Sequence, residues 1–278
     1  MKYFVSSALL YLFVSYSLLA QEDLFKKGME AYNQKNYLNS LILFGETLEH
    51  KYLISGKDLP RAYCYRAKSI INIYEQAISK NDTFMMSRFP DMLVVAYDDL
   101  DEAKKFDNGK MKSMLKETFE DLGQITIWFC QTVAKQLRLD FHHKNEVDSL
   151  LGVIKDELVL LERHQFRNQG YLDLLGLIEY KSKNYELAES YFRESRSMPE
   201  DGSVDLLDID HLYSYYYDGL IKYHENHEFE DALINVKEAK KRLFLTQTSF
   251  KDSVYALDHS QLVSKLEDLE IRLELLVN

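Results

Sequence analysis

Glycine and proline are scarce in this sequence, since its 278 residues include only 10 glycines and 3 prolines. Both residues interrupt regular helices, and a run rich in proline, glycine and serine would indicate a flexible linker. No such run occurs. Leucine, lysine, glutamate and alanine, which favour helices, are abundant. The composition therefore predicts an all-α protein without a linker between domains.

Cysteine is also rare, with Cys64 and Cys130 only. The chain contains no paired-cysteine zinc signature and no H-E-x-x-H motif. It also lacks the phosphate-binding patterns G-x-G-x-x-G and G-x-x-x-x-G-K and the nucleophile elbow G-x-S-x-G. We therefore expect a protein that is not an enzyme and has no cofactor. Catalysis stays an alternative, because site residues converge only in the fold.

Positive charge is in deficit, because 34 lysines and arginines face 45 aspartates and glutamates, a net charge of −11. Removing Lys2 with the leader described below gives −11 − 1 = −12. Phosphate binding needs clustered lysine and arginine, so this balance disfavours nucleic acid and anionic membranes as partners.

The longest apolar run lies at the start of the chain. Residues 1–20 contain one basic residue, Lys2, then an apolar stretch that ends at Ala20 before Gln21 and Glu22. This order of charge and hydrophobicity predicts a secretory signal peptide, and no cysteine of a lipoprotein follows the expected cut. We expect an exported protein, periplasmic or secreted, that does not insert into a membrane after cleavage. An uncleaved anchor is the alternative.

The stretch from Tyr171 to Pro199 has the clearest internal pattern. Its apolar residues recur at helical period on both sides of a polar turn at Lys181 to Asn184, which predicts two short amphipathic helices. Small residues recur where the paired helices would approach, at Gly176, Ala188 and Ser195.

This spacing resembles the tetratricopeptide repeat, a helix-turn-helix unit of about 34 residues. Gly28 leads a second copy, and Gly219 leads a third whose turn carries one extra residue. Two looser units lie between the copy led by Gly28 and the copy at Tyr171 to Pro199. The resemblance implies one α-solenoid over residues 21–278, of an exported bacterial type. Its hairpins fall at about 22–50, 59–107, 110–164, 168–200 and 208–246, and a capping helix at 253–277.

The last helix repeats leucine at spacings of four and three, a short coiled-coil seam. Two interpretations follow: the helix caps the array, or the chain forms a weak homodimer through residues 262–276. The repeat register also separates Cys64 from Cys130 by about 15 Å, too far for a disulfide. We therefore expect two free thiols.

The family resemblance implies a concave groove, lined by the first helices, that binds an extended peptide or protein segment. The hypothesis is a non-enzymatic interaction scaffold of the cell envelope. The candidate groove residues are Met29, Tyr32, Asn33, Asp173, Leu177, Tyr180, Lys181, Tyr213, Tyr216, Leu220 and Tyr223. Part of the tyrosines would instead fill the core between repeats, with hydroxyls at its rim.

Competing hypotheses are a metal-dependent enzyme on a helical scaffold and a structural spacer in an envelope assembly. The enzyme would depend on His211, His224 and His227, of which the last two have a ligand-like spacing of three on a helix. Solvated histidines are the simpler interpretation. The acidic loop 200–210 lacks the spacing of a calcium loop, and Asn81 starts an Asn-Asp-Thr glycosylation triplet that matters only in a eukaryote.

Overall fold

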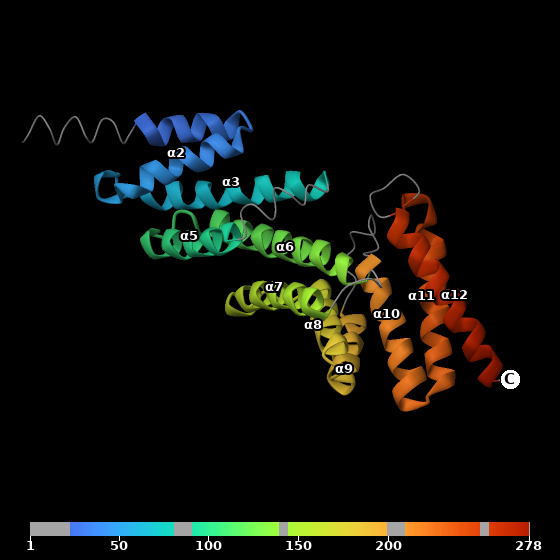
Figure 1. The fold of residues 1–278 in the computed structure, drawn as a ribbon. Helices are drawn as coiled ribbons and strands as arrows, with labels where there is room; N and C mark the ends of the chain where they lie inside the picture. The colour runs from blue at the N-terminus through green and yellow to red at the C-terminus, as the bar shows by residue number, and fades with distance from the viewer. Residues whose placement is uncertain (1–22, 81–90, 139–143, 199–208, 251–255, 278) are drawn as a thin grey trace, which may run out of the picture. The chain divides into compact units, whose positions relative to one another are not determined.

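A computed structural model describes residues 23–80, 91–138, 144–198, 209–250 and 256–277 (Figure 1). Within these ranges every regular element is a helix, which confirms the all-α prediction. The chain forms two compact units, residues 1–129 and 130–278, whereas the repeat pattern predicts a single array. None of the described helices is both long enough and apolar enough to span a lipid bilayer.

The first unit consists of helices that pack on their neighbours along the chain. Its central helix α3 lies against both α2 and α5, and begins at the Leu59-Pro60 pair that suits a first turn. The first part of α6 packs here too, since Thr118 Oγ1 lies 3.8 Å from Cys64 Sγ and Thr126 Oγ1 lies 3.2 Å from Tyr97 Oη. The elements are a helix at 23–33, α2 (Tyr37–Glu49), a 3-10 turn (Lys51–Leu53), α3 (Leu59–Ser79), α5 (Met92–Phe106) and α6 (Lys112–Leu137).

The second unit begins within α6 and is organised around α10, which packs against α8, α9, α11 and α12. The elements are α7 (Lys144–Arg163), α8 (Gln169–Lys181), α9 (Tyr185–Ser197), α10 (Ile209–Ile221), a π-helical turn (Lys222–Asn226), α11 (Phe229–Phe250) and α12 (Ala256–Val277). Neighbours pair as α8 with α9, α10 with α11, and α11 with α12. Helix periodicity alone predicted most of these elements within a few residues.

Glycines sit where paired helices approach most closely. A Cβ atom at Gly176 would lie 2.3 Å from the Phe192 ring, and one at Gly28 would lie 3.0 Å from the Phe44 ring. Both phenylalanines are fully buried. A Cβ at Gly219 would meet Val236 at 3.4 Å, an ordinary contact. The small residues are therefore needed most at Gly176, less at Gly28 and least at Gly219.

The turns of the first two repeat copies share the sequence Lys-Asn-Tyr and one geometry. Lys35 and Lys183 have φ of 58° and 65°, in the left-handed region. Each follows its helix as the residue that closes a Schellman motif: the Asn184 N–H donates to the Glu179 carbonyl at 2.9 Å, and the Lys183 N–H to the Tyr180 carbonyl at 3.0 Å. Side chains other than glycine are strained in this conformation.

Replacing Lys183 with glycine is expected to raise the free energy of unfolding by about 0.5 to 1 kcal/mol. Relief of left-handed strain exceeds the entropy that glycine adds to the unfolded chain. Urea denaturation measures the change. The adjacent Ser182, at φ −82°, is the control, and Ser182→Gly should give no gain. Equal effects at the two positions would contradict the explanation.

The extra residue in the turn of the third copy appears as a change of helix type. Helix α10 does not stop as α8 does but widens into the π-helical turn Lys222–Asn226. His227 then takes the left-handed position at φ 58°, and the Glu228 N–H donates to the Lys222 carbonyl at 2.9 Å. A π turn accommodates one more residue than an α turn, so Phe229 still starts α11.

Both cysteines are free and buried, as predicted. Burial raises the pKa of the Cys64 thiol and that of the Cys130 thiol. The two residues behave as small core side chains rather than as reactive nucleophiles.

Candidate functional site

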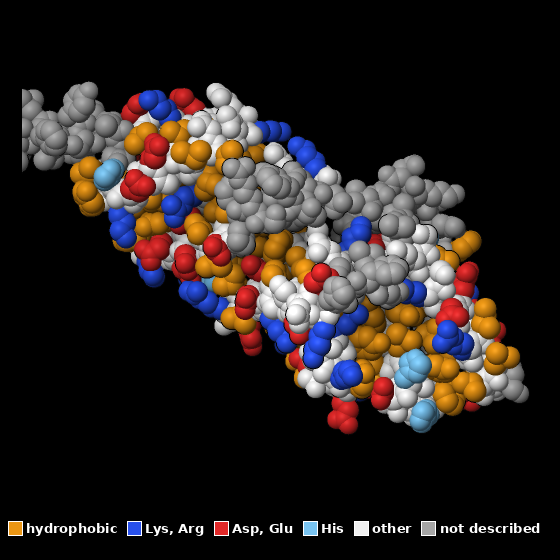
Figure 2. Space-filling model, viewed as in Figure 1, with side chains coloured by type: hydrophobic (Ala, Val, Ile, Leu, Met, Phe, Trp, Pro, Cys, Tyr) orange, Lys and Arg blue, Asp and Glu red, His pale blue; other side chains and the backbone are white. Residues whose placement is uncertain are grey.

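Aromatic side chains gather along one side of α10. Tyr213, Tyr216 and Leu220 follow one another at spacings of three and four, so they share a face of α10, and Tyr223 follows on the π-helical turn that continues the helix. Tyr213 is buried, whereas the other three are half-buried and reach the surface. Figure 2 shows hydrophobic side chains collected over α10 and α11, with lysine and arginine side chains beside them. This surface is the candidate site.

Tyr180 joins this surface from the last turn of α8. Its ring centroid lies 4.7 Å from that of Tyr217, which in turn lies 5.5 Å from Tyr216. Tyr217 is buried behind the other two and supports both rings. Burial raises the pKa of Tyr180 to about 12, further above neutral pH than the ordinary tyrosine value. We call Tyr180, Tyr216, Leu220 and Tyr223 the tyrosine face.

Cations lie over the rings of this cluster. The Arg138 guanidinium is 4.3 Å from the Tyr213 ring centroid, the Lys181 ammonium 5.9 Å from Tyr217, and the Lys265 ammonium 6.0 Å from Tyr216. Cations within about 6 Å of a ring face are attracted to it. These contacts tie three segments distant in sequence to the tyrosines and hold the rings in place.

The cavity next to this cluster is too small for a ligand. Its volume is about 10 Å³, room for about one water molecule, and its polar lining includes Arg138, Asp173 and Ser214. Sites for small molecules are usually hundreds of Å³ in volume. This cavity is therefore not the candidate site, which is the exposed surface of the tyrosine face.

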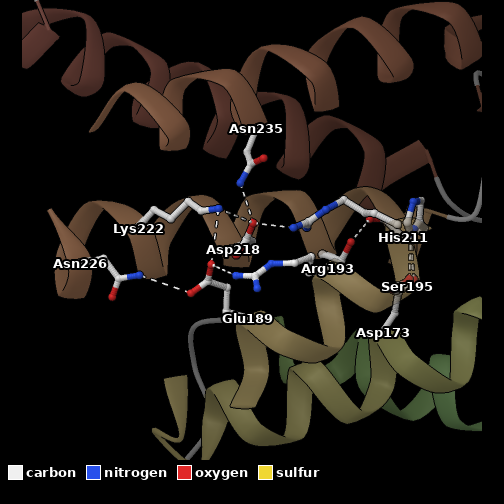
Figure 3. Close-up of polar contacts among 11 residues, drawn as sticks. Asp173, Glu189, Arg193, Ser195, His211, Asp218, Lys222, Asn226 and Asn235 are labelled. Atoms are coloured by element: carbon white, nitrogen blue, oxygen red, sulfur yellow. Dashed lines mark hydrogen bonds and ion pairs between the residues drawn. The ribbon is translucent and has the colours of Figure 1, made fainter. Parts of the chain in front are cut away.

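Two further candidate groove residues on α8 face inward. Leu177 is buried, and the buried Asp173 carboxylate accepts from Ser195 Oγ at 2.6 Å and lies 3.0 Å from His211 Nδ1 (Figure 3). The Gln169 amide lies 3.2 Å from His211 Nε2. This network joins α8, α9 and α10, so Asp173 links helices within the unit. Lys181 lies half-buried at the end of α8.

Serine, histidine and aspartate meet in this network, but not as a nucleophilic triad. In a triad the aspartate and the serine bind opposite ring nitrogens of the histidine. Here Asp173 and Ser195 both lie on the Nδ1 side of His211, at 3.0 and 3.5 Å, and the serine proton goes to the aspartate. Ser195 is fully buried. The arrangement serves packing rather than acyl transfer.

A second polar network centres on Asp218 of α10, which has no exposed surface. One of its oxygens, Oδ2, accepts from Arg196 Nη2 at 2.7 Å, Asn235 Nδ2 at 2.6 Å and Lys222 Nζ at 3.4 Å (Figure 3). Lys222 Nζ also lies 3.6 Å from Glu189. Helices α9, α10 and α11 therefore converge on a single carboxylate, which fixes the orientation of the helix that carries the tyrosine face.

The candidate residues of the first repeat copy belong to the other compact unit. Tyr32 is half-buried, its ring centroid lying 5.1 Å from Tyr65 of α3, and its hydroxyl accepts from Asn72 at 3.4 Å. Met29 is half-buried and Asn33 exposed. Tyr32 is the aromatic member of this set, and its ring contacts are with Tyr37 and Tyr65, of which the sequence did not single out Tyr65.

The three histidines of the metal hypothesis are not brought together. His211 is buried at the start of α10, and His224, thirteen residues later, is exposed on the π turn, about 20 Å away by helical rise. His227 is exposed at its left-handed turn position. Among the described residues, no three histidine, cysteine or acidic side chains are placed to hold a metal ion.

Several sequence predictions fall outside the described residues. The leader 1–20, the glycosylation triplet at Asn81 and most of the acidic loop 200–210 belong to this group. They stay predictions.

The chain matches no protein-family model, no curated protein and no solved structure.

Proposed function

We propose that this chain is a non-enzymatic interaction scaffold of the cell envelope, exported as its leader predicts, that binds a peptide or protein segment on the tyrosine face. The main support is a set of half-exposed tyrosines whose rings pack on buried neighbours. Tyr180 and Tyr216 both rest on the buried Tyr217. Rings fixed before binding lose little entropy in a complex, which is why tyrosine is frequent among the residues that dominate interface energies.

The resemblance to the tetratricopeptide repeat supports the same surface. It implies hairpins stacked as an α-solenoid whose first helices line the binding face, and Tyr180 and Tyr223 come from such helices. Glycines at the closest helix approaches agree with this packing.

Replacing both Tyr180 and Tyr223 with alanine is expected to weaken peptide binding about 10-fold or more, because each half-buried ring offers a preorganised contact. Peptides selected from a displayed library on the wild-type chain provide the probe. Isothermal titration calorimetry then compares their affinity for the two proteins, and circular dichroism checks that helicity is intact.

Tyr52→Ala is the matched control, since Tyr52 on the 3-10 turn of the other unit is 78% exposed and its ring centroid lies 6.3 Å from that of His50. It should leave the affinity unchanged. Equal binding by the wild type and the double variant, or an equal loss in Tyr52→Ala, would refute the tyrosine face as the binding site.

A further inference from the structure

The leucine seam predicted for a homodimer is used inside the chain. Four of its five leucines, Leu262, Leu266, Leu269 and Leu273, are buried where α12 packs on α10 and α11, whereas Leu276 near the end of the helix is 52% exposed. The four buried side chains cannot contact a second copy while α12 stays in place. Any association of copies through this hairpin must therefore use its other side.

That other side is apolar at several positions. On α12, Ile271 is 61% exposed and Leu275 79% exposed, and they stand four residues apart on one face. On α11, Ile234 and Phe244 are 64% and 76% exposed. An ion pair between Lys237 and Glu274, both about half exposed, connects the two helices. The exposed sides of α11 and α12 therefore form one continuous surface, the outer hairpin face.

Opposite charges are divided between the two helices of this surface. Residues 237–242 of α11 contain four cations and one anion, a net charge of 4 − 1 = +3. Residues 267–274 of α12 contain four anions and one cation, a net charge of 1 − 4 = −3. The pairs Lys237 with Glu274 and Lys240 with Glu270 place these segments side by side in antiparallel register. The surface is therefore electrically complementary to itself.

We propose that two copies of this chain associate through the outer hairpin face, with α11 of each copy packed on α12 of the other about a two-fold axis. A two-fold interface uses the same surface twice, so it needs a patch that carries both members of each contact. The basic segment of α11 then faces the acidic segment of the partner's α12, and Ile234, Phe244, Ile271 and Leu275 are covered. If α11 packed on α11 and α12 on α12, a net charge of +3 would instead face +3, and a net charge of −3 would face −3.

Sedimentation equilibrium of the purified chain over a range of concentrations tests this interface. The wild type should show a monomer–dimer equilibrium, and Ile271→Asp should raise the dissociation constant at least 10-fold. Val159→Asp is the control, because Val159 on α7 is also 61% exposed but lies outside the outer hairpin face. A wild type that stays monomeric at its highest soluble concentration, or equal effects of the two substitutions, would overturn the proposal.

Charge reversal tests the pairing of α11 with α12. Two double variants are made, Lys237→Glu/Lys241→Glu on α11 and Glu267→Lys/Glu274→Lys on α12. Each should abolish the homodimer, because each places like charges on α11 of one copy and α12 of the other. Mixing the two variants should restore a dimer that contains one copy of each. The ion pairs that these substitutions remove are exposed, so their loss should change the stability of the fold little. Circular dichroism checks that the variants are folded. Failure to form the mixed dimer would refute this pairing, whatever the result of peptide binding to the tyrosine face.

Discussion

Gly176→Ala is expected to lower the free energy of unfolding by about 2 to 3 kcal/mol, in the upper part of the range usual for overpacking a core. The new Cβ would lie 2.3, 2.5 and 2.8 Å from three atoms of the Phe192 ring. Phe192 is fully buried and lies against Tyr217, so the ring has little room to move. Helices α8 and α9 must separate to admit the methyl group. Chemical denaturation monitored by circular dichroism measures the loss.

Three other glycines turn this result into a graded test. At Gly28 the nearest ring atom is 3.0 Å away and at Gly219 the nearest atom is 3.4 Å away, whereas at Gly152 on α7 nothing lies within 4 Å. Alanine at Gly152 should stabilise the chain by up to about 1 kcal/mol, because alanine favours helices. The losses should follow the order Gly176, Gly28, Gly219. A different order would show that helix propensity, and not close approach, governs these positions.

Asp218→Ala is expected to lower the free energy of unfolding by about 3 to 5 kcal/mol, the typical result of removing one partner of a buried ion pair. Arg196 and Asn235 both donate to Asp218 Oδ2 and would lose their acceptor inside the unit. Because α9, α10 and α11 meet there, thermal unfolding should show the effect as a lower melting temperature of the second unit.

Asp268→Ala provides the comparison for Asp218. Asp268 pairs with Arg272 at 2.7 Å, but both side chains are more than half exposed. Exposed pairs of this kind contribute about 0 to 1 kcal/mol. Equal losses at Asp218 and Asp268 would contradict a structural role for the buried network.

Local periodicity predicted the helices and their close contacts well. The apolar pattern on each side of Lys181 to Asn184 specifies α8 and α9, and the small residue at Gly176 marks where they meet, because both features depend on residues close in sequence. The same reasoning placed α3 from Leu59 to Ser79. The division into two compact units was not predicted, because no change of composition marks it.

The surroundings of the site were harder to predict. Arg138 lies over the ring of Tyr213, 75 residues later in the chain, and Lys265 contacts both the Arg138 carbonyl and the Tyr216 ring. No local pattern links such distant residues. Periodicity assigns a residue to a face of its helix but does not say how many neighbours cover that face. Asp173 and Tyr213, both candidate groove residues, are buried.

The π-helical turn after α10 shows that helix pairing in this chain tolerates a change in loop length. One additional residue between Gly219 and Phe229 changes only the local winding, and Ala232, Val236 and Ala239 stay fully buried. Insertions and deletions at such junctions would therefore be nearly neutral during evolution. Related chains are then expected to keep the spacing within each helix while their repeat lengths drift apart.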